Sequence, residues 1–186
     1  MNSRIPFGIF LAVALIQLSI PAQMIWRHER SLTKGRAYRF RTAPVDPYDA
    51  FRGRFVALRF EQEKAPWKDR QPARRGQSVY ALIEEGSDGF AHFSGATAHK
   101  PVAGDYIVAH VSWPEANNTV HLILPFDRFY MEETLAPAAE RAYREHNSRS
   151  NQNASAVVRV LNGLGVIENV FVANKPIGEF IRDAKR

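Results

Sequence analysis

The feature that most constrains this chain is an uncharged, mainly apolar run near its amino terminus. Residues 5–26 contain no Asp, Glu, Lys or Arg. As an α-helix rising about 1.5 Å per residue, this run reaches roughly 33 Å, enough to cross the hydrocarbon core of a bilayer. Trp26 stands at its far end, where an aromatic side chain favours the membrane interface. We therefore expect membrane lipid to be a partner of the chain through residues 5–26.

Two other interpretations of this run stay open. A cleaved signal peptide requires small residues before the cut, and Ile20 occupies a position that needs a small side chain. A buried core helix that is apolar on all sides is rare in a small domain. Pro21 should kink or end the helix. With an uncleaved anchor as the first interpretation, residues 1–34 form a tail, an anchor and a helical extension ended by Gly35, and residues 35–186 form a single β-rich domain.

The charges around the run give conflicting signals about orientation. A short amino-terminal tail would stay in the cytoplasm and send the following domain outside. The positive-inside tendency would instead hold the basic residues after the run on the cytoplasmic side. These residues are Arg27, Arg30, Lys34 and Arg36. We take the first orientation, with the domain outside the cytoplasm.

The composition indicates a folding chain and limits its chemistry. Hydrophobic residues make up 45% and charged residues 24%, which is typical of folded domains. The absence of cysteine excludes disulfides, Cys-ligated zinc and thiol nucleophiles. The net charge of +6 permits attraction to anionic lipid. Arg36, Arg39 and Arg41 form the only tight basic cluster and are candidate lipid-head-group contacts. No nucleic-acid-binding motif surrounds them, so we expect no nucleic-acid partner.

Apolar segments with a period of two, bounded by turn residues, predict mostly antiparallel β structure. In residues 36–42, Tyr38 and Phe40 share one face. Residues 155–161 pair with 166–173 through an Asn-Gly turn. Residues 128–145 predict one helix, which begins properly near Ala136 because a proline interrupts it before that point. We expect about eight strands in a sandwich or partly open barrel with this helix packed on it.

A hairpin of residues 105–113 and 118–124 is the clearest of these elements. If residues 114–117 form its loop, Val111 faces Val120 and their neighbours pair on one apolar face. The same register places His110 opposite His121. Two imidazoles on adjacent strands can share a metal ion, with His92 or His99 as a third ligand. The competing interpretation is a pair of solvent-facing or locally hydrogen-bonded histidines.

The stretch PVDPYDAFRGRFVALRF, residues 44–60, connects the anchored part to the β domain. Its prolines and aspartates predict a turn, and Gly53 permits a tight step in the backbone. An alternating strand follows. The stretch resembles the motif of the GDYXXLXY family, a bacterial family of membrane-anchored proteins of uncharacterised function. The resemblance rests on Asp46, Pro47, Arg52, Gly53, Arg54, Phe55, Leu58 and Phe60.

This chain departs from the family motif where chemistry would need polar groups. Arg54 replaces the motif's Asp, and Phe55 and Phe60 replace its two Tyr. A guanidinium does not deprotonate and a phenyl ring has no polar atom, so an acid–base or metal-binding role is lost at these positions. A structural strand is the simpler interpretation, in which Leu58 and Phe60 fill the core. The resemblance implies a bacterial inner-membrane location and no activity or cofactor.

These observations rank three functions. The first is non-enzymatic: an accessory or binding subunit of a membrane complex, with an integral membrane protein as partner. The sequence offers no convincing nucleophile or acid–base pair, so we assign no catalytic residue. An envelope hydrolase or metal-dependent enzyme with a site near His110 and His121 is the first alternative. A lipid or small-ligand sensor that uses Arg36, Arg39 and Arg41 is the second.

Overall fold

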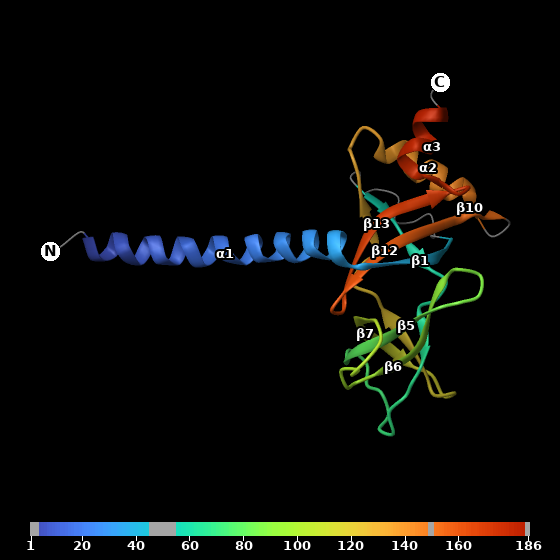
Figure 1. Cartoon of the computed structure of the whole chain (residues 1–186), viewed down its shortest axis with the longest axis horizontal. Coiled ribbons are helices and arrows are strands. Elements are labelled where there is room, and N and C mark those ends of the chain that lie inside the picture. Colours follow the sequence, from blue (N-terminus) through green and yellow to red (C-terminus); the bar gives the residue numbers. More distant parts are fainter. Residues whose placement is uncertain (1–3, 45–54, 149–150, 185–186) are drawn as a thin grey trace.

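The structure is a computed structural model that describes residues 4–44, 55–148 and 151–184. One long helix projects from the edge of a β-rich body (Figure 1). The helices are α1 (Arg4–Lys34), α2 (Ala136–His146) and α3 (Ile177–Ala184). The strands are β1 (Arg36–Ala43), β2 (Phe55–Ala57), β3 (Arg59–Phe60), β4 (Lys64–Pro66), β5 (Ser78–Glu85), β6 (Ala91–Thr97), β7 (Tyr106–Pro114), β8 (Thr119–Ile123), β9 (Arg128–Tyr130), β10 (Asn147–Ser148), β11 (Asn151–Gln152), β12 (Ala154–Leu161), β13 (Leu164–Val172) and β14 (Lys175–Pro176).

Two five-stranded sheets make up most of the body. The first has the strand order β14-β13-β12-β1-β3, and the second has the order β4-β8-β7-β5-β6. Short pairs β2–β9 and β10–β11 complete the β structure of the described residues. Helices α2 and α3 lie against the first sheet, at the end of the body far from β5, β6 and β7 (Figure 1). The expected fold class, mainly β with antiparallel sheets and one packed helix near Ala136, is confirmed.

Aromatic side chains join the two sheets. Phe40 on β1 packs against Phe93 on β6, with ring centroids 5.6 Å apart. Phe60 and Phe126 meet edge to face at 5.3 Å, and Phe126 also contacts Phe40. These rings are buried, and burial of aromatic side chains is a major stabilising contribution to a core of this size. One hydrophobic core therefore runs through both sheets.

A partly buried hydrogen bond adds a polar connection between the sheets. The hydroxyl of Tyr38 on β1 donates to the carboxylate of Asp105, just before β7, over 2.7 Å. Burial, followed by this bond to Asp105, raises the pKa of Tyr38 to about 12. The phenol therefore stays protonated and keeps donating throughout the physiological pH range. The expected inward face of residues 36–42 is confirmed, since Tyr38 and Phe40 are both buried.

The hairpin of β7 and β8 has a different register from the expected one. Val111 pairs with Leu122 and not with Val120, and an irregularity between Val111 and Trp113 displaces the pairing further. A shift of two residues keeps the same side chains on the inner face, so apolar alternation cannot distinguish the two registers. The turn decides between them. Asn118 adopts a positive φ of 59°, and its side chain donates to the carbonyl of Trp67 over 2.8 Å.

The helical pattern of residues 128–145 extends too far at its start. Residues 128–130 form β9 and pair with β2, and the helix itself begins at Ala136 as expected. Residues 64–66 form β4 and pair with β8. Both strands are three residues long, too short for a period of two to reveal them.

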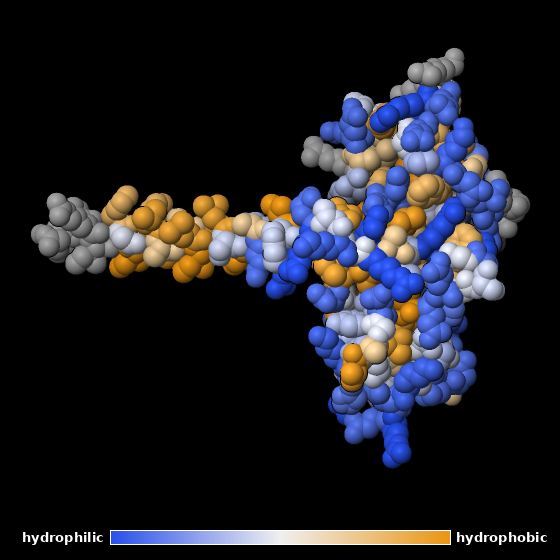
Figure 2. Space-filling model, viewed as in Figure 1, coloured by the Kyte–Doolittle hydropathy of each residue, from blue (hydrophilic) through white to orange (hydrophobic). Residues whose placement is uncertain are grey.

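Helix α1 is long and apolar enough to cross a membrane. It continues through Pro21, which therefore does not end it, and it ends at Lys34 before Gly35, as expected. None of the most apolar 18-residue window of this helix is buried within the chain. Figure 2 shows the apolar residues of α1 bare along the part that projects from the body.

The last turns of α1 are attached to the turn end of β12 and β13. Ser31 is fully buried, and its hydroxyl lies 3.2 Å from the carbonyl oxygen of Arg159 and 3.3 Å from that of Leu164. The guanidinium of Arg159 donates to the carbonyl of Gly35 over 3.2 Å. Hydrogen bonds thus run in both directions between the helix end and the sheet, which fixes the direction in which α1 leaves the body.

The turn between β12 and β13 has only two residues, Asn162 and Gly163, with φ of 51° and 85°. Two positive φ values in a two-residue loop match the twist of the flanking strands, as the Asn-Gly sequence predicts. A Cβ on Gly163 would lie 2.7 Å from Cε2 of Tyr106 and 2.8 Å from Cγ2 of Val108. This close approach brings the hairpin turn against β7.

We expect Gly163→Ala to destabilise the protein more than Gly104→Ala. Both glycines have nearly the same φ, 85° and 86°, but a Cβ on Gly104 would meet no atom within 4 Å. The left-handed backbone costs about 1 to 2 kcal/mol at each position. The clash at Gly163 adds roughly 1 to 3 kcal/mol. Denaturant unfolding of the full chain in detergent would measure the difference, and equal losses would contradict the packing of this turn on β7.

Candidate functional site

The family-motif residues are divided between the structural core and a segment outside the description. Asp46, Pro47, Arg52, Gly53 and Arg54 lie outside the described residues. Phe55 begins β2, where its ring lies 5.6 Å from that of Tyr130 on β9, between centroids. Leu58 and Phe60 are buried members of the core, as the interpretation of a structural strand predicts.

The strand of the motif changes partners along its length. Val56 in β2 pairs with Phe129 in β9, whereas Phe60 in β3 pairs with Thr42 in β1. The backbone N–H of Leu58, between the two, donates to the carbonyl of Asp127 over 2.8 Å. This stretch therefore links the small β2–β9 pair to the first sheet, and its apolar side chains serve packing.

The two histidines proposed as metal ligands are not paired with each other. His110 pairs with Ile123, and His121 lies opposite Trp113, on which its ring stacks with centroids 3.9 Å apart. No group of three or more His, Cys, Asp or Glu side chains suited to a metal ion occurs in the described part of the chain. The register on which the metal site of His110 and His121 was built is therefore wrong.

His121 has a local hydrogen-bond partner instead. Its Nε2 bonds the carboxylate of Glu115, which also accepts a bond of 2.8 Å from Lys64. The Lys64 ammonium first, and then His121, hold the pKa of the Glu115 carboxyl below its usual value. The three side chains connect β4, β8 and the hairpin loop, which matches the competing interpretation of a locally bonded histidine.

All three arginines proposed as lipid contacts have partners inside the chain. Arg36 lies 3.7 Å from Glu85 and 3.9 Å from Asp105, between guanidinium nitrogens and carboxylate oxygens. Nε of Arg39 donates to the hydroxyl of Ser155 over 2.9 Å. A lipid phosphate would have to compete with these groups, although Arg36 remains largely exposed.

Arg41, the third of these arginines, lies over the ring of Phe90, 3.9 Å from the centroid, and 3.2 Å from Asp88. The backbone N–H of Phe90 and the guanidinium of Arg41 hold the pKa of the Asp88 carboxyl below its usual value. The arginine cluster that the sequence singled out is thus engaged in binding strands and turns of its own domain.

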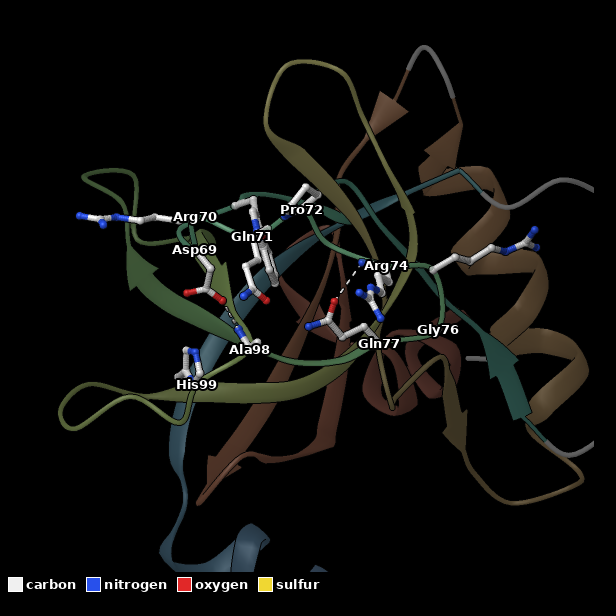
Figure 3. A pocket seen from close by; sticks show the side chains of 11 residues that line it. Asp69, Arg70, Gln71, Pro72, Arg74, Gly76, Gln77, Ala98 and His99 are labelled. Atoms are coloured by element: carbon white, nitrogen blue, oxygen red, sulfur yellow. Dashed lines mark hydrogen bonds between the residues drawn. The ribbon is translucent and has the colours of Figure 1, made fainter.

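The structure contains a pocket that sequence reasoning missed. It has a volume of about 870 Å³ and lies between residues 67–77 and the end of β6 (Figure 3). The residues that define its walls are Trp67, Asp69, Arg70, Arg74, Gln77 and His99. It is built from a connection and a strand end, where ligand sites commonly occur.

Hydrogen bonds hold the first half of this connection in place. The indole N–H of buried Trp67 donates to the carbonyl of Gln71 over 2.7 Å. The two carboxylate oxygens of Asp69 accept from the hydroxyl of Thr97 over 2.8 Å and from the N–H of Ala98 over 2.7 Å. These bonds fasten the pocket wall to β6, and they occupy both oxygens of its carboxylate.

The second half of the connection is anchored to β7. The N–H of Gly76 donates to the carbonyl of Val111 over 2.7 Å, and the amide oxygen of Gln77 accepts from the N–H of Arg74 over 2.9 Å. Figure 3 shows Arg74 beside Gln77 on one side of the pocket, while Arg70 points outward from the other side. The pocket therefore has a hydrogen-bonded backbone frame with exposed cationic side chains on it.

The charge of the pocket favours an anionic ligand. Arg70, Arg74 and Arg75 are exposed and form no ion pair with any residue the structure describes. His99 adds an imidazole, and each carboxylate oxygen of Asp69 already accepts a hydrogen bond from the chain. Guanidinium groups bind carboxylates and phosphates through paired N–H donors, so the pocket is suited to either group.

A sequence signal for this pocket existed only in part. The Arg74-Arg75-Gly76 run lies in a polar segment that contains Pro66 and Pro72, a composition typical of loops, where binding residues commonly occur. The opposing wall at Ala98 and His99 comes from a different strand, and only the fold brings it to residues 67–77.

Comparison with known proteins identifies one family. The GDYXXLXY protein family matches the chain over residues 17–170, from within α1 to within β13. No curated protein and no solved structure matches the chain.

We expect Asp69→Ala to loosen the pocket wall. The change leaves the Thr97 hydroxyl and the Ala98 N–H without their acceptor, which costs about 1 to 3 kcal/mol. Hydrogen–deuterium exchange at the Ala98 amide should accelerate. Asp183→Ala is the matched control, because this carboxylate contacts exposed Lys175 at 3.2 Å and its loss should cost less than about 1 kcal/mol. Equal exchange in both variants would show that Asp69 does not hold the wall.

Proposed function

The chain belongs to the GDYXXLXY protein family, and we propose that it is a membrane-anchored binding protein that serves as an accessory subunit of a membrane complex. The observation that carries the proposal is the bare apolar surface of α1. Ile9, Phe10 and Leu11 are 62%, 67% and 50% exposed. Successive residues of a helix point about 100° apart, so these three side chains are exposed in different directions around it. An apolar surface of this kind requires lipid or an apolar protein surface around it.

The attachment of α1 to the sheet supports a role in which the anchor presents the β domain to a partner in a fixed orientation. A flexible tether would let the domain search a wide volume, whereas the Ser31 junction fixes the domain relative to the helix. A fixed geometry suits a subunit that must meet a partner embedded in the same membrane. We place the chain in the cytoplasmic membrane of a bacterium, with the domain outside the cytoplasm.

The arginine-lined pocket is the surface that we assign to the partner. Arg70, Arg74 and Arg75 line the pocket and are all exposed, so the surface extends beyond what a small buried ligand would need. Complementary charge across an interface raises the association rate and suppresses wrong partners. We therefore expect acidic side chains on the partner, opposite these three arginines.

The test is purification of the full-length chain from its native membranes in a mild detergent, through a tag at the carboxyl terminus. We expect an integral membrane protein to co-purify in a near-stoichiometric amount. The double variant Arg74→Gln/Arg75→Gln should recover about tenfold less of it, because charge-assisted hydrogen bonds are lost.

Arg141→Gln/Arg182→Gln is the matched control, since it removes two exposed arginines from α2 and α3, away from the pocket. A wild-type chain that purifies alone as a monomer contradicts the complex. A partner that the Arg74/Arg75 variant retains in full contradicts the pocket as the contact, while leaving the complex in place.

A further inference from the structure

A second pocket lies where α1 meets the body. It has a volume of about 490 Å³ and is enclosed by the last apolar turn of α1 and by the turn between β12 and β13. The helix contributes Arg27 and Arg30, and the hairpin contributes Leu161, Asn162 and Leu164. Met24 and Trp26 of the helix also line it, so the pocket combines apolar side chains from both elements with a cationic pair on the helix.

The position of this pocket along α1 determines its depth relative to the membrane. The uncharged run of the helix ends at Trp26, and Arg27 follows at once. If the run lies in the hydrocarbon core, as the proposed anchoring requires, Trp26 and the pocket lie at the level of the lipid head groups. The inference below rests on that part of the proposed function.

The two arginines of the pocket share one face of the helix. Residues three apart on a helix are neighbours, so Arg27 and Arg30 lie on the same side. The guanidinium of Arg30 lies 5.1 Å from the ring centroid of Trp26, a cation–π contact that holds it next to the interface. Two positive charges thus face the pocket at its membrane end.

No carboxylate of the described chain neutralises this pair. Neither Arg27 nor Arg30 forms an ion pair with a residue that the structure describes. Glu29 is one residue from Arg30 and two from Arg27, spacings at which helix side chains do not face each other. Glu29 lines a neighbouring hollow of α1 together with Trp26, Arg30, Thr33 and Lys34, and it forms no ion pair with Arg30. The charge of the arginine pair is left for a ligand.

The frame of the pocket is rigid. Ser31, one turn further along α1, bonds the carbonyls of Arg159 and Leu164, at the two sides of the hairpin turn. Nδ1 of His28 donates to the carbonyl of Met24 over 2.9 Å, which holds its ring along the helix. The backbone of α1 is therefore held against the hairpin before any ligand binds, which lowers the entropic cost of binding.

We propose that this pocket binds the head group of an anionic phospholipid from the adjoining leaflet. The phosphate lies against Arg27 and Arg30, and the first methylenes of the chains lie against Leu161 and Leu164. Arginine binds phosphate through paired N–H donors. A soluble phosphate would contact only the two arginines. A phospholipid would contact the arginines through its phosphate and the apolar side chains of the pocket through its acyl chains. A zwitterionic lipid carries its own cation and gains less from the arginine pair.

The first test compares lipids bound to the full chain in detergent by native mass spectrometry. Phosphatidylglycerol should bind more tightly than phosphatidylcholine of the same acyl chains. Arg27→Gln/Arg30→Gln should weaken phosphatidylglycerol binding by about fivefold for each arginine removed, and phosphatidylcholine binding less. The control Arg141→Gln/Arg182→Gln should keep the preference. Thermal unfolding of both variants, whose changed side chains are all exposed, checks that each is folded.

Two additional arms separate the possible outcomes. Glycerol 3-phosphate carries the same phosphate group without acyl chains. It should not displace the bound lipid even at concentrations that would saturate a site for free phosphate. Displacement of the lipid would overturn the proposal. Flotation with phosphatidylcholine vesicles tests the anchoring alone. A chain that floats but shows equal affinity for both lipids, or a preference that the Arg27/Arg30 variant retains, overturns the lipid site and leaves the anchor. A chain that does not float overturns both.

Discussion

The attachment of α1 to β12 and β13 through Ser31 is the interaction on which the rest of this structure depends. The domain cannot bury the apolar surface of α1, because the helix meets the body only at its last turns. A fully buried hydroxyl at that point requires hydrogen-bond partners, and the carbonyls of Arg159 and Leu164 supply them. The helix is consequently free to meet lipid along its length while its base is held at one place on the sheet.

The proposed roles of both pockets depend on this attachment. The pocket at Arg27 and Arg30 exists because the hairpin is held against α1 directly after the uncharged run. The pocket at Arg74 belongs to the second sheet, which the aromatic contacts around Phe40 join to the first. A membrane protein that reaches this pocket therefore meets a surface whose position is determined by the anchor. The same rigidity that favours a constant presentation would be a disadvantage for a protein that searches for distant ligands.

Local patterns in the sequence predicted the long helices and strands. They failed where the structure depends on strand register or on contacts between segments far apart in the sequence. The alternation around Tyr38 and Phe40, the Asn162-Gly163 turn and the helix after Ala136 follow from side-chain period, turn chemistry and the position of a proline. The β7–β8 register was wrong because a two-residue shift preserves the alternation, and His110 and His121 separated with it. The arginine-lined pocket could not be predicted, because His99 and Arg74 belong to separate segments that line one pocket only in the folded chain.

A distance measurement across the junction tests the central claim of a rigid attachment most directly. The chain has no cysteine, so spin labels can be placed uniquely at Gln23→Cys on α1 and Ile123→Cys on β8, both exposed positions. Double electron–electron resonance on the full chain in lipid nanodiscs should give one narrow distance distribution. A broad distribution would mean that the domain swings on α1, and it would contradict the account of an anchor that fixes where the domain lies.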